Sequence, residues 1–388
     1  MLKTIRIKKF ILLLLLATQL GACQKKEDMS TEKLDYNGKA CTPENYPVDI
    51  LNRNVFYSNG GEYITLIPDG GTDGSVWGHS GNGWASEPKP APDHLSINWY
   101  SPTEMKIYEG EFELPQKRIY DLFKEGYMAF GVPNDTKDGK ETLYWETYNT
   151  LLVGIAPKGM VVVWIAGSDK KVELGRFQAH ELSKKDANEL YKKVFKLSDG
   201  MHEKVTEKEL LKYDVSPEVI ALALNGTISC KQWDDYRLRY NWKVVFNQPL
   251  QIYDYSMRYF NSEINGGPPP NIKQEEYNKI ILEPSSKVVP REIDLNVTTQ
   301  DGKDYVIRLD ILDELETIKA FKDLEIASPK EEISIFIDIN KDFNEFKVIL
   351  KNSKKQILLE KATLKLFTID RKDERNNKKI FQSIPKSN

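Results

Sequence analysis

The residue types that most often carry catalysis are present in this chain, but their spacing forms no known catalytic or metal-binding motif. The histidines are His79, His94, His180 and His202. The chain has no HExxH, no GxSxG, no phosphate-binding GxxxxGK[ST] loop and no GxGxxG followed by a helical pattern. The adjacent carboxylates Asp234 and Asp235 would point to opposite faces of a strand, which is poor geometry for a glycosidase pair. We therefore predict that the protein is not an enzyme and holds no metal or other cofactor.

One cysteine has a clear chemical role, the attachment of lipid. Residues 1–22 contain four basic residues and no acidic ones, and residues 10–16 are an unbroken apolar run. That run is too short to span a bilayer but has the length of a signal-peptide core. It ends in Leu20-Gly21-Ala22-Cys23, which resembles the lipobox of bacterial lipoproteins. We predict a signal peptide over residues 1–22 and acylation of Cys23, which would anchor the chain in a lipid bilayer of the cell envelope.

The residue after Cys23 bears on which membrane is reached. Gln24 stands there, where enteric bacteria use aspartate to retain a lipoprotein in the inner membrane. We therefore expect the outer membrane, on its periplasmic face or at the cell surface.

Two further cysteines, Cys41 and Cys230, remain once Cys23 carries lipid. In an exported protein such a pair could form a disulfide. The alternative is two buried free thiols, and the sequence leaves both open. Their separation excludes a CxxC redox motif, and no cysteine–histidine spacing is typical of a zinc site.

Aromatic residues are abundant, at 11% of the chain, and two short segments favour a binding surface. Trp77 lies in the glycine-rich stretch of residues 70–83, which is typical of a loop, and Trp84 directly follows that stretch. Trp233 and Tyr236 have aspartates as neighbours. Tryptophan and tyrosine are common anchors of protein interfaces. The alternative for all four is packing in a β-sheet core, where aromatic residues are also common.

The overall charge argues against one class of partner. Cleavage after residue 22 would take the net charge from −3 to −7. Nucleic-acid binding needs a basic face or stripe, so we exclude nucleic acid and expect a protein partner whose identity the sequence does not give.

The hydrophobic pattern predicts an α+β protein dominated by antiparallel sheets, with a few helices. Two apolar runs, residues 150–155 and 160–165, flank a Pro-Lys-Gly turn and predict a buried hairpin. Helices are predicted after Pro115, from Ser183 with Asp186, and from Thr206 with Glu209. The other predicted strands cover residues 62–67, 95–99, 105–114, 237–246, 250–260, 291–298, 305–311, 333–339, 346–350, 357–359 and 364–369, with a helix over 313–324.

The sequence Gly266-Gly267-Pro268-Pro269-Pro270 is the clearest break in these patterns, since three prolines continue neither a strand nor a helix. We expect a flexible tether over residues 23–45 and an aromatic-rich β-dominated domain over 46–270. A smaller C-terminal α+β domain would cover 286–370, and a polar tail 371–388.

Several motifs resemble the domain of unknown function 2931 family. They are Leu95-Ser96-Ile97-Asn98-Trp99-Tyr100-Ser101, the turn Gly154-Ile155-Ala156-Pro157-Lys158-Gly159, and the later Tyr240-Asn241-Trp242 and Phe260-Asn261-Ser262-Glu263. The resemblance covers about residues 62–265 and carries no catalytic residue. It implies a bacterial lipoprotein, and some members are encoded beside type VI secretion effectors. We therefore expect a non-catalytic protein-binding lipoprotein, such as an immunity protein against a secreted toxin. The alternatives are an envelope scaffold or assembly lipoprotein and a carbohydrate-binding or hydrolytic one.

Overall fold

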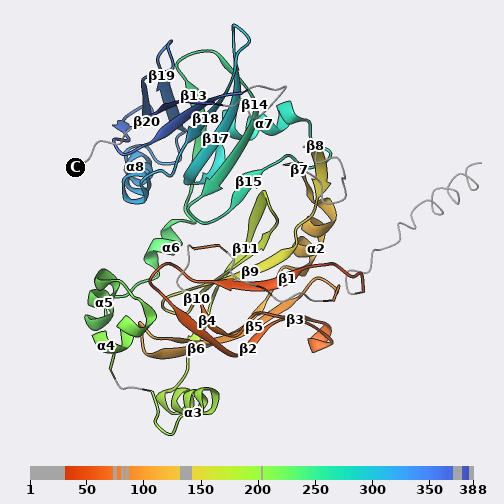
Figure 1. Ribbon diagram of the computed structural model, residues 1–388, viewed down its shortest axis with the longest axis vertical. Coiled ribbons are helices and arrows are strands. Elements are labelled where there is room, and N and C mark those ends of the chain that lie inside the picture. Colours follow the sequence, from red (N-terminus) through yellow and green to blue (C-terminus); the bar gives the residue numbers. More distant parts are fainter. Residues whose placement is uncertain are drawn as a thin grey trace, which may run out of the picture.

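The computed structural model describes residues 31–72, 77–79, 83, 87–131, 142–201, 204–369 and 378–383. In this part of the chain strands predominate over helices, which confirms a β-dominated α+β fold. Figure 1 shows one half of the molecule built mainly from the earlier strands and the other from the later ones, with the short helix α6 (Lys231–Asp235) between them. Cys23 lies outside the described residues, and so do Trp84 and His202.

The largest sheet runs through both halves. In spatial order its strands are β1 (Asn37–Cys41), β9 (Thr150–Ala156), β10 (Met160–Ala166), β11 (Lys170–Gln178), β15 (Ile264–Gly266), β14 (Leu250–Tyr259), β17 (Pro290–Thr299), β18 (Asp304–Leu309), β22 (Leu364–Thr368) and β23 (Lys378–Gln382). The pairs are antiparallel except for β1 and β9, which are parallel.

Two smaller sheets and a ribbon complete the β-structure. The second sheet has the order β12 (His180–Glu181), β6 (Lys106–Glu113), β5 (His94–Ser101), β2 (Val48–Ser58) and β3 (Tyr63–Leu66), with β4 (Gly70–Thr72) also on β2. The third has the order β16 (Ser285–Val288), β13 (Arg239–Phe246), β19 (Ile333–Ile339), β20 (Phe346–Lys351) and β21 (Gln356–Leu358). Strands β7 (Tyr127–Gly131) and β8 (Thr142–Glu146) form the ribbon.

Several helices begin where their sequences predict. The longer ones are α2 (Gln116–Glu125), α3 (Lys184–Phe195), α5 (Pro217–Leu224), α7 (Gln274–Leu282) and α8 (Glu314–Ala327), and the shorter ones are α4 (Glu207–Leu210) and the 3-10 turns η1 (Asn59–Gly61) and η2 (Leu211–Tyr213). The side chains of Ser183, Thr206 and Asp313 each accept a hydrogen bond from the backbone N–H three residues on, which caps α3, α4 and α8.

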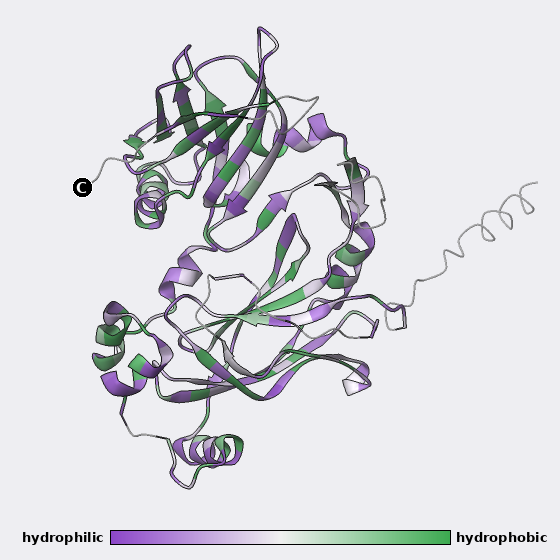
Figure 2. Cartoon of the chain, in the orientation of Figure 1, coloured by the Kyte–Doolittle hydropathy of each residue, from purple (hydrophilic) through white to green (hydrophobic). Residues whose placement is uncertain are grey.

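The hairpin of β9 and β10 confirms its prediction and joins the two main cores. All of its strand residues are buried, and Lys158 and Gly159 have the positive φ angles of a tight hairpin turn. Because side chains alternate across a strand, Leu151, Val153 and Ile155 pack toward the β2–β5–β6 sheet. Leu152 and Trp164 face the opposite core, which continues to the last strands of the chain. Figure 2 shows apolar residues along the strands of both halves and polar ones along α6.

The structure does not divide at residues 266–270 as the proline run predicts. Strand β14 precedes that segment and pairs with β17, which follows it. Likewise β13 pairs with β19. Strands β13 and β14, which follow one another in the chain, belong to two different sheets. One of the two main cores therefore forms from segments on both sides of the break, whereas the other comes from residues 34–179 alone.

The predicted tether and tail are also partly folded. Residues 37–41, placed in the tether, form β1 and add a parallel strand beside β9. Glu32 is bound by the Tyr120 hydroxyl and by Lys124 of α2. Near the other end, residues 378–382, placed in the polar tail, form β23 beside β22. In both strands the backbone of a polar segment forms hydrogen bonds with a neighbouring strand. The polar composition of these segments does not predict that pairing.

Candidate binding cleft

A cleft with a volume of about 830 Å³ lies where the two halves meet. One wall comes from the loop after β1, from Trp77 and from helices α5 and α6. The other comes from the end of β14, the start of β17, the residues leading into α8, and residues 361 and 363. Ligand-binding cavities in proteins are commonly about 300–1,000 Å³ in volume, so this cleft could take a side-chain cluster or a small ligand.

The inner part of the cleft is aromatic. Tyr46 meets Trp233 edge to face, with ring centroids 5.3 Å apart. Trp233 in turn lies 6.2 Å from Trp77, which meets Trp164 edge to face at 5.1 Å. Gly154 makes this close packing feasible, because a Cβ there would lie 2.5 Å from the Trp164 ring and 2.8 Å from Trp77. The aromatic surface is thus held rigidly by the core behind it.

A second aromatic pair continues this surface toward α8. Tyr236 stacks on Phe260, with ring centroids 5.8 Å apart. Its hydroxyl accepts a hydrogen bond of 2.7 Å from the Gln232 side chain, which also donates to Glu314. Burial, followed by the charge of Glu314, raises the pKa of Tyr236, so this hydroxyl stays neutral at physiological pH.

The rim of the cleft is polar and charged, with one exposed apolar side chain. Lys361 forms an ion pair of 3.2 Å with Asp313. The backbone N–H of Glu316 is the main cause that lowers the pKa of Asp313, which therefore stays ionised. A general acid needs a raised pKa, so Asp313 is not suited to that role. Ile311 is 56% exposed and lines the cleft beside these charges.

The structure places three of the four predicted binding aromatics together, but not on an exposed surface. Trp77, Trp233 and Tyr236 line the cleft but are only 8%, 4% and 6% exposed, because each packs into the core behind it. Trp84, the fourth of these aromatic residues, lies outside the described residues. Sequence analysis missed Trp145, which is 52% exposed on β8. Its alternation with Leu143, also exposed, was the available signal.

The two cysteines are free thiols in the structure. Cys41 is buried at the end of β1, and burial raises its pKa to about 12. Cys230 is half-buried at the start of α6, and burial raises its pKa as well. Cys41 belongs to the core that continues into the cleft, and Cys230 packs against that core.

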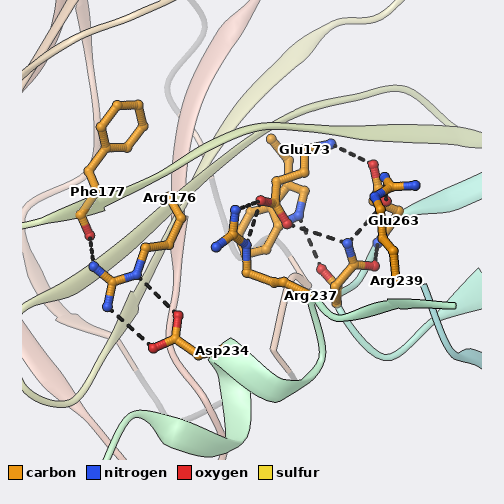
Figure 3. Close-up of polar contacts among 9 residues, drawn as sticks. Glu173, Arg176, Phe177, Asp234, Arg237, Arg239 and Glu263 are labelled. Carbon is orange, nitrogen blue, oxygen red and sulfur yellow. Dashed lines mark hydrogen bonds and ion pairs between the residues drawn. The ribbon is translucent and has the colours of Figure 1, made fainter. Parts of the chain in front are cut away.

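A network of ion pairs holds the wall of the cleft to the large sheet (Figure 3). Arg176 of β11 pairs with Asp234 of α6 at 3.2 Å. Asp234 and Asp235 lie in helix α6 and not in a strand, and Asp235 forms its own ion pairs with Lys231 and Lys322. These aspartates serve as structural anchors of α6.

The same network has a more buried centre. Glu173 of β11 lies 2.6 Å from Arg237 and also accepts a hydrogen bond from Asn261. Asn261 donates to Glu263 as well, and Glu263 lies 3.7 Å from the exposed Arg239. Burial raises the pKa of Glu173, and Arg237 offsets part of that rise. The arrangement fixes α6 and β13 against β11.

Two further searches of the described residues bear on function. No group of three or more His, Cys, Asp or Glu is placed to hold a metal ion there. Across the same residues, no helix has both the length and the apolar character needed to cross a membrane.

Comparison with known proteins gives one match. The family model described as "Protein of unknown function (DUF2931)" matches residues 22–220, just over half of the chain. The resemblance seen in the sequence covers about residues 62–265, whereas the family model covers 22–220. The motifs at 240–242 and 260–263 therefore lie outside the match. No curated protein and no solved structure matches the chain. Helix α6 and the whole opposite wall of the cleft come from residues after 220, so the cleft depends on sequence outside the family match.

Proposed function

Because this chain belongs to the DUF2931 family of proteins of unknown function, no activity transfers to it, and we propose its function from its own sequence and cleft. It is an envelope lipoprotein, anchored in the outer membrane through acylated Cys23, that binds a protein partner without catalysis. The partner is a secreted toxin, and the lipoprotein acts as its immunity protein.

The observation that carries the binding role is the composition of the cleft. Aromatic side chains line its interior, and Ile311 is exposed among the charged side chains of its rim. Protein interfaces have this arrangement, with a few buried aromatic anchors surrounded by a polar border. The interior is also rigid, because Trp77 and Trp233 are packed against the core. A rigid surface loses little conformational entropy when a partner docks.

The first test changes the rim without disturbing the core. Ile311→Asp is expected to weaken partner binding about tenfold, since the apolar contact of Ile311 would be lost and the partner would desolvate the new carboxylate, at a cost of about 1–2 kcal/mol. The partner is first identified by cross-linking and co-purification from native membranes, and its affinity is then measured by titration. Leu315→Asp is the matched control, because Leu315 is 78% exposed and does not line the cleft. Equal loss in both variants would contradict a role of the cleft.

The second test concerns immunity. A strain that lacks the gene is expected to be outcompeted by its parent when the secretion system of the parent is active. Wild-type protein should restore survival and Ile311→Asp should not, because protection requires the toxin to be bound. Normal competition by the deletion strain would disprove the immunity role. Turnover of an envelope polymer by the purified wild-type protein would disprove the non-catalytic role.

A further inference from the structure

A second, smaller pocket adjoins the cleft and is strongly basic. Its volume is about 420 Å³, and it shares Tyr259 and Arg291 with the cleft. The cationic side chains that line it are Lys39, Lys171, Arg258 and Arg291, and the partly buried His79 lies beside them. They come from four strands of the large sheet, β1, β11, β14 and β17, and from the loop around residue 79. Sequence positions so far apart meet only because the sheet joins both halves of the molecule.

Lys171 is the most buried of these cations. It is 8% exposed, and among the described residues its Nζ donates to two neutral oxygens, the carbonyl of Gly78 at 2.5 Å and the hydroxyl of Ser262 at 3.1 Å. Gly78 has a positive φ, and a Cβ there would lie 1.7 Å from the Ser262 hydroxyl, so the backbone approaches this lysine closely. Burial lowers the pKa of Lys171 to about 8, which leaves it mostly charged at pH 7.

The anionic groups near the pocket do not neutralise it. Arg258 pairs with Glu292 at 3.2 Å, but Arg291 is half-buried and forms no ion pair or side-chain hydrogen bond with a described residue. Glu263 is the carboxylate that lines the pocket, and its oxygens already accept from Asn261 and from the backbone of Glu173. Partial burial lowers the pKa of His79, and the charges of Lys171, Arg291 and Arg258 lower it further. Positive potential therefore accumulates here, at a free-energy cost that a bound anion would offset.

We propose that this pocket binds the phosphate group of a phosphate monoester. Several clustered cations match a dianion better than a single carboxylate, and the planar fork of Arg291 can donate two parallel hydrogen bonds to phosphate oxygens. Thr150 and Ser168 also line the pocket, but their hydroxyls already donate to Asn149 and Glu146, so the cationic side chains would hold the phosphate. The ester could be a soluble phosphorylated compound or the head group of a lipid, and both present the same chemistry.

The test is a titration of the full chain, purified in a non-ionic detergent, with inorganic phosphate, glycerol 3-phosphate and short-chain phosphatidic acid. Binding is followed by calorimetry and by the ³¹P resonance. Saturable binding of inorganic phosphate is expected at about millimolar concentration or below, and Arg291→Gln should weaken it about tenfold. A lipid source is indicated if phosphatidic acid binds about tenfold more tightly than glycerol 3-phosphate, and a soluble source if the two bind alike.

Two further measurements distinguish the pocket from general charge attraction. Arg53→Gln removes the same charge from a side chain that is 54% exposed, paired with Glu109 and outside the pocket, and it should change the affinity less than about twofold. Wild-type affinity should fall between pH 7 and pH 9 as Lys171 loses its proton, while Lys171→Met should bind weakly with a flatter pH profile. Equal losses in Arg291→Gln and Arg53→Gln, or no saturable binding of any of the three compounds, would overturn the proposal.

Discussion

Replacing Cys23 with serine is expected to leave an unacylated precursor that no longer partitions with the detergent phase. The thiol is the only group in the proposed lipobox that can take the diacylglyceryl unit. Each buried methylene of an acyl chain contributes about 0.8 kcal/mol to membrane binding, so loss of the chains removes stable anchoring altogether. The measurement is metabolic labelling with fatty acid, followed by detergent phase separation.

A matched control for this change is Cys41→Ser, because Cys41 is buried in β1 and lies outside the signal sequence. That variant is expected to lose some stability but to retain label and partition. If Cys23→Ser still carried labelled fatty acid and partitioned like wild type, the lipoprotein proposal would be wrong.

Removing the arginine of the central ion pair is expected to have the largest effect on folding. Arg237→Met leaves the Glu173 carboxylate, whose side chain is only 12% exposed, without its cation. Breaking a buried pair from one side costs about 3–5 kcal/mol, and we expect about 3 because the Arg237 side chain is 32% exposed. Chemical denaturation at pH 7.5 gives the free energy of unfolding of both proteins.

Lowering the pH should reduce the loss of stability caused by Arg237→Met. Burial holds the pKa of Glu173 above its usual value, so its charge is unfavourable in the folded state at neutral pH. That penalty disappears as the pH falls through the raised pKa, and without Arg237 the pKa would rise further. The difference in free energy of unfolding between Arg237→Met and wild type should therefore be smaller at pH 5 than at pH 7.5.

Two additional variants make this prediction specific. Arg237→Met combined with Glu173→Gln should be more stable than Arg237→Met alone, because the uncompensated charge is gone. Arg239→Met should cost at most about 1 kcal/mol, since Arg239 is 52% exposed and its pair with Glu263 is 3.7 Å long. If Arg239→Met were as damaging as Arg237→Met, burial of the Glu173 charge could not be the cause.

Local features of the sequence were sufficient for much of the secondary structure. The two apolar runs around Pro157 to Gly159 predict β9 and β10 because a hairpin is encoded within about twenty residues by its turn and its strands. The caps at Ser183, Thr206 and Asp313 are equally local, since each bond joins residues three apart. The family resemblance also rested on short motifs, and the match over residues 22–220 confirms it.

The cleft and the basic pocket could not be predicted in this way, because their residues meet through pairings between distant segments. Residues 37–41 form a strand because they pair in parallel with β9. Strands β14 and β17 pair with each other although the proline run that predicts a domain boundary lies between them in the sequence. The same pairings bring Trp77 beside Trp233, and Lys171 into one pocket with Arg291. By itself the sequence determined the fold class, the hairpin, the capped helices and the family. Only the tertiary structure decided which side chains are buried together, because burial depends on the partner strand that each segment finds.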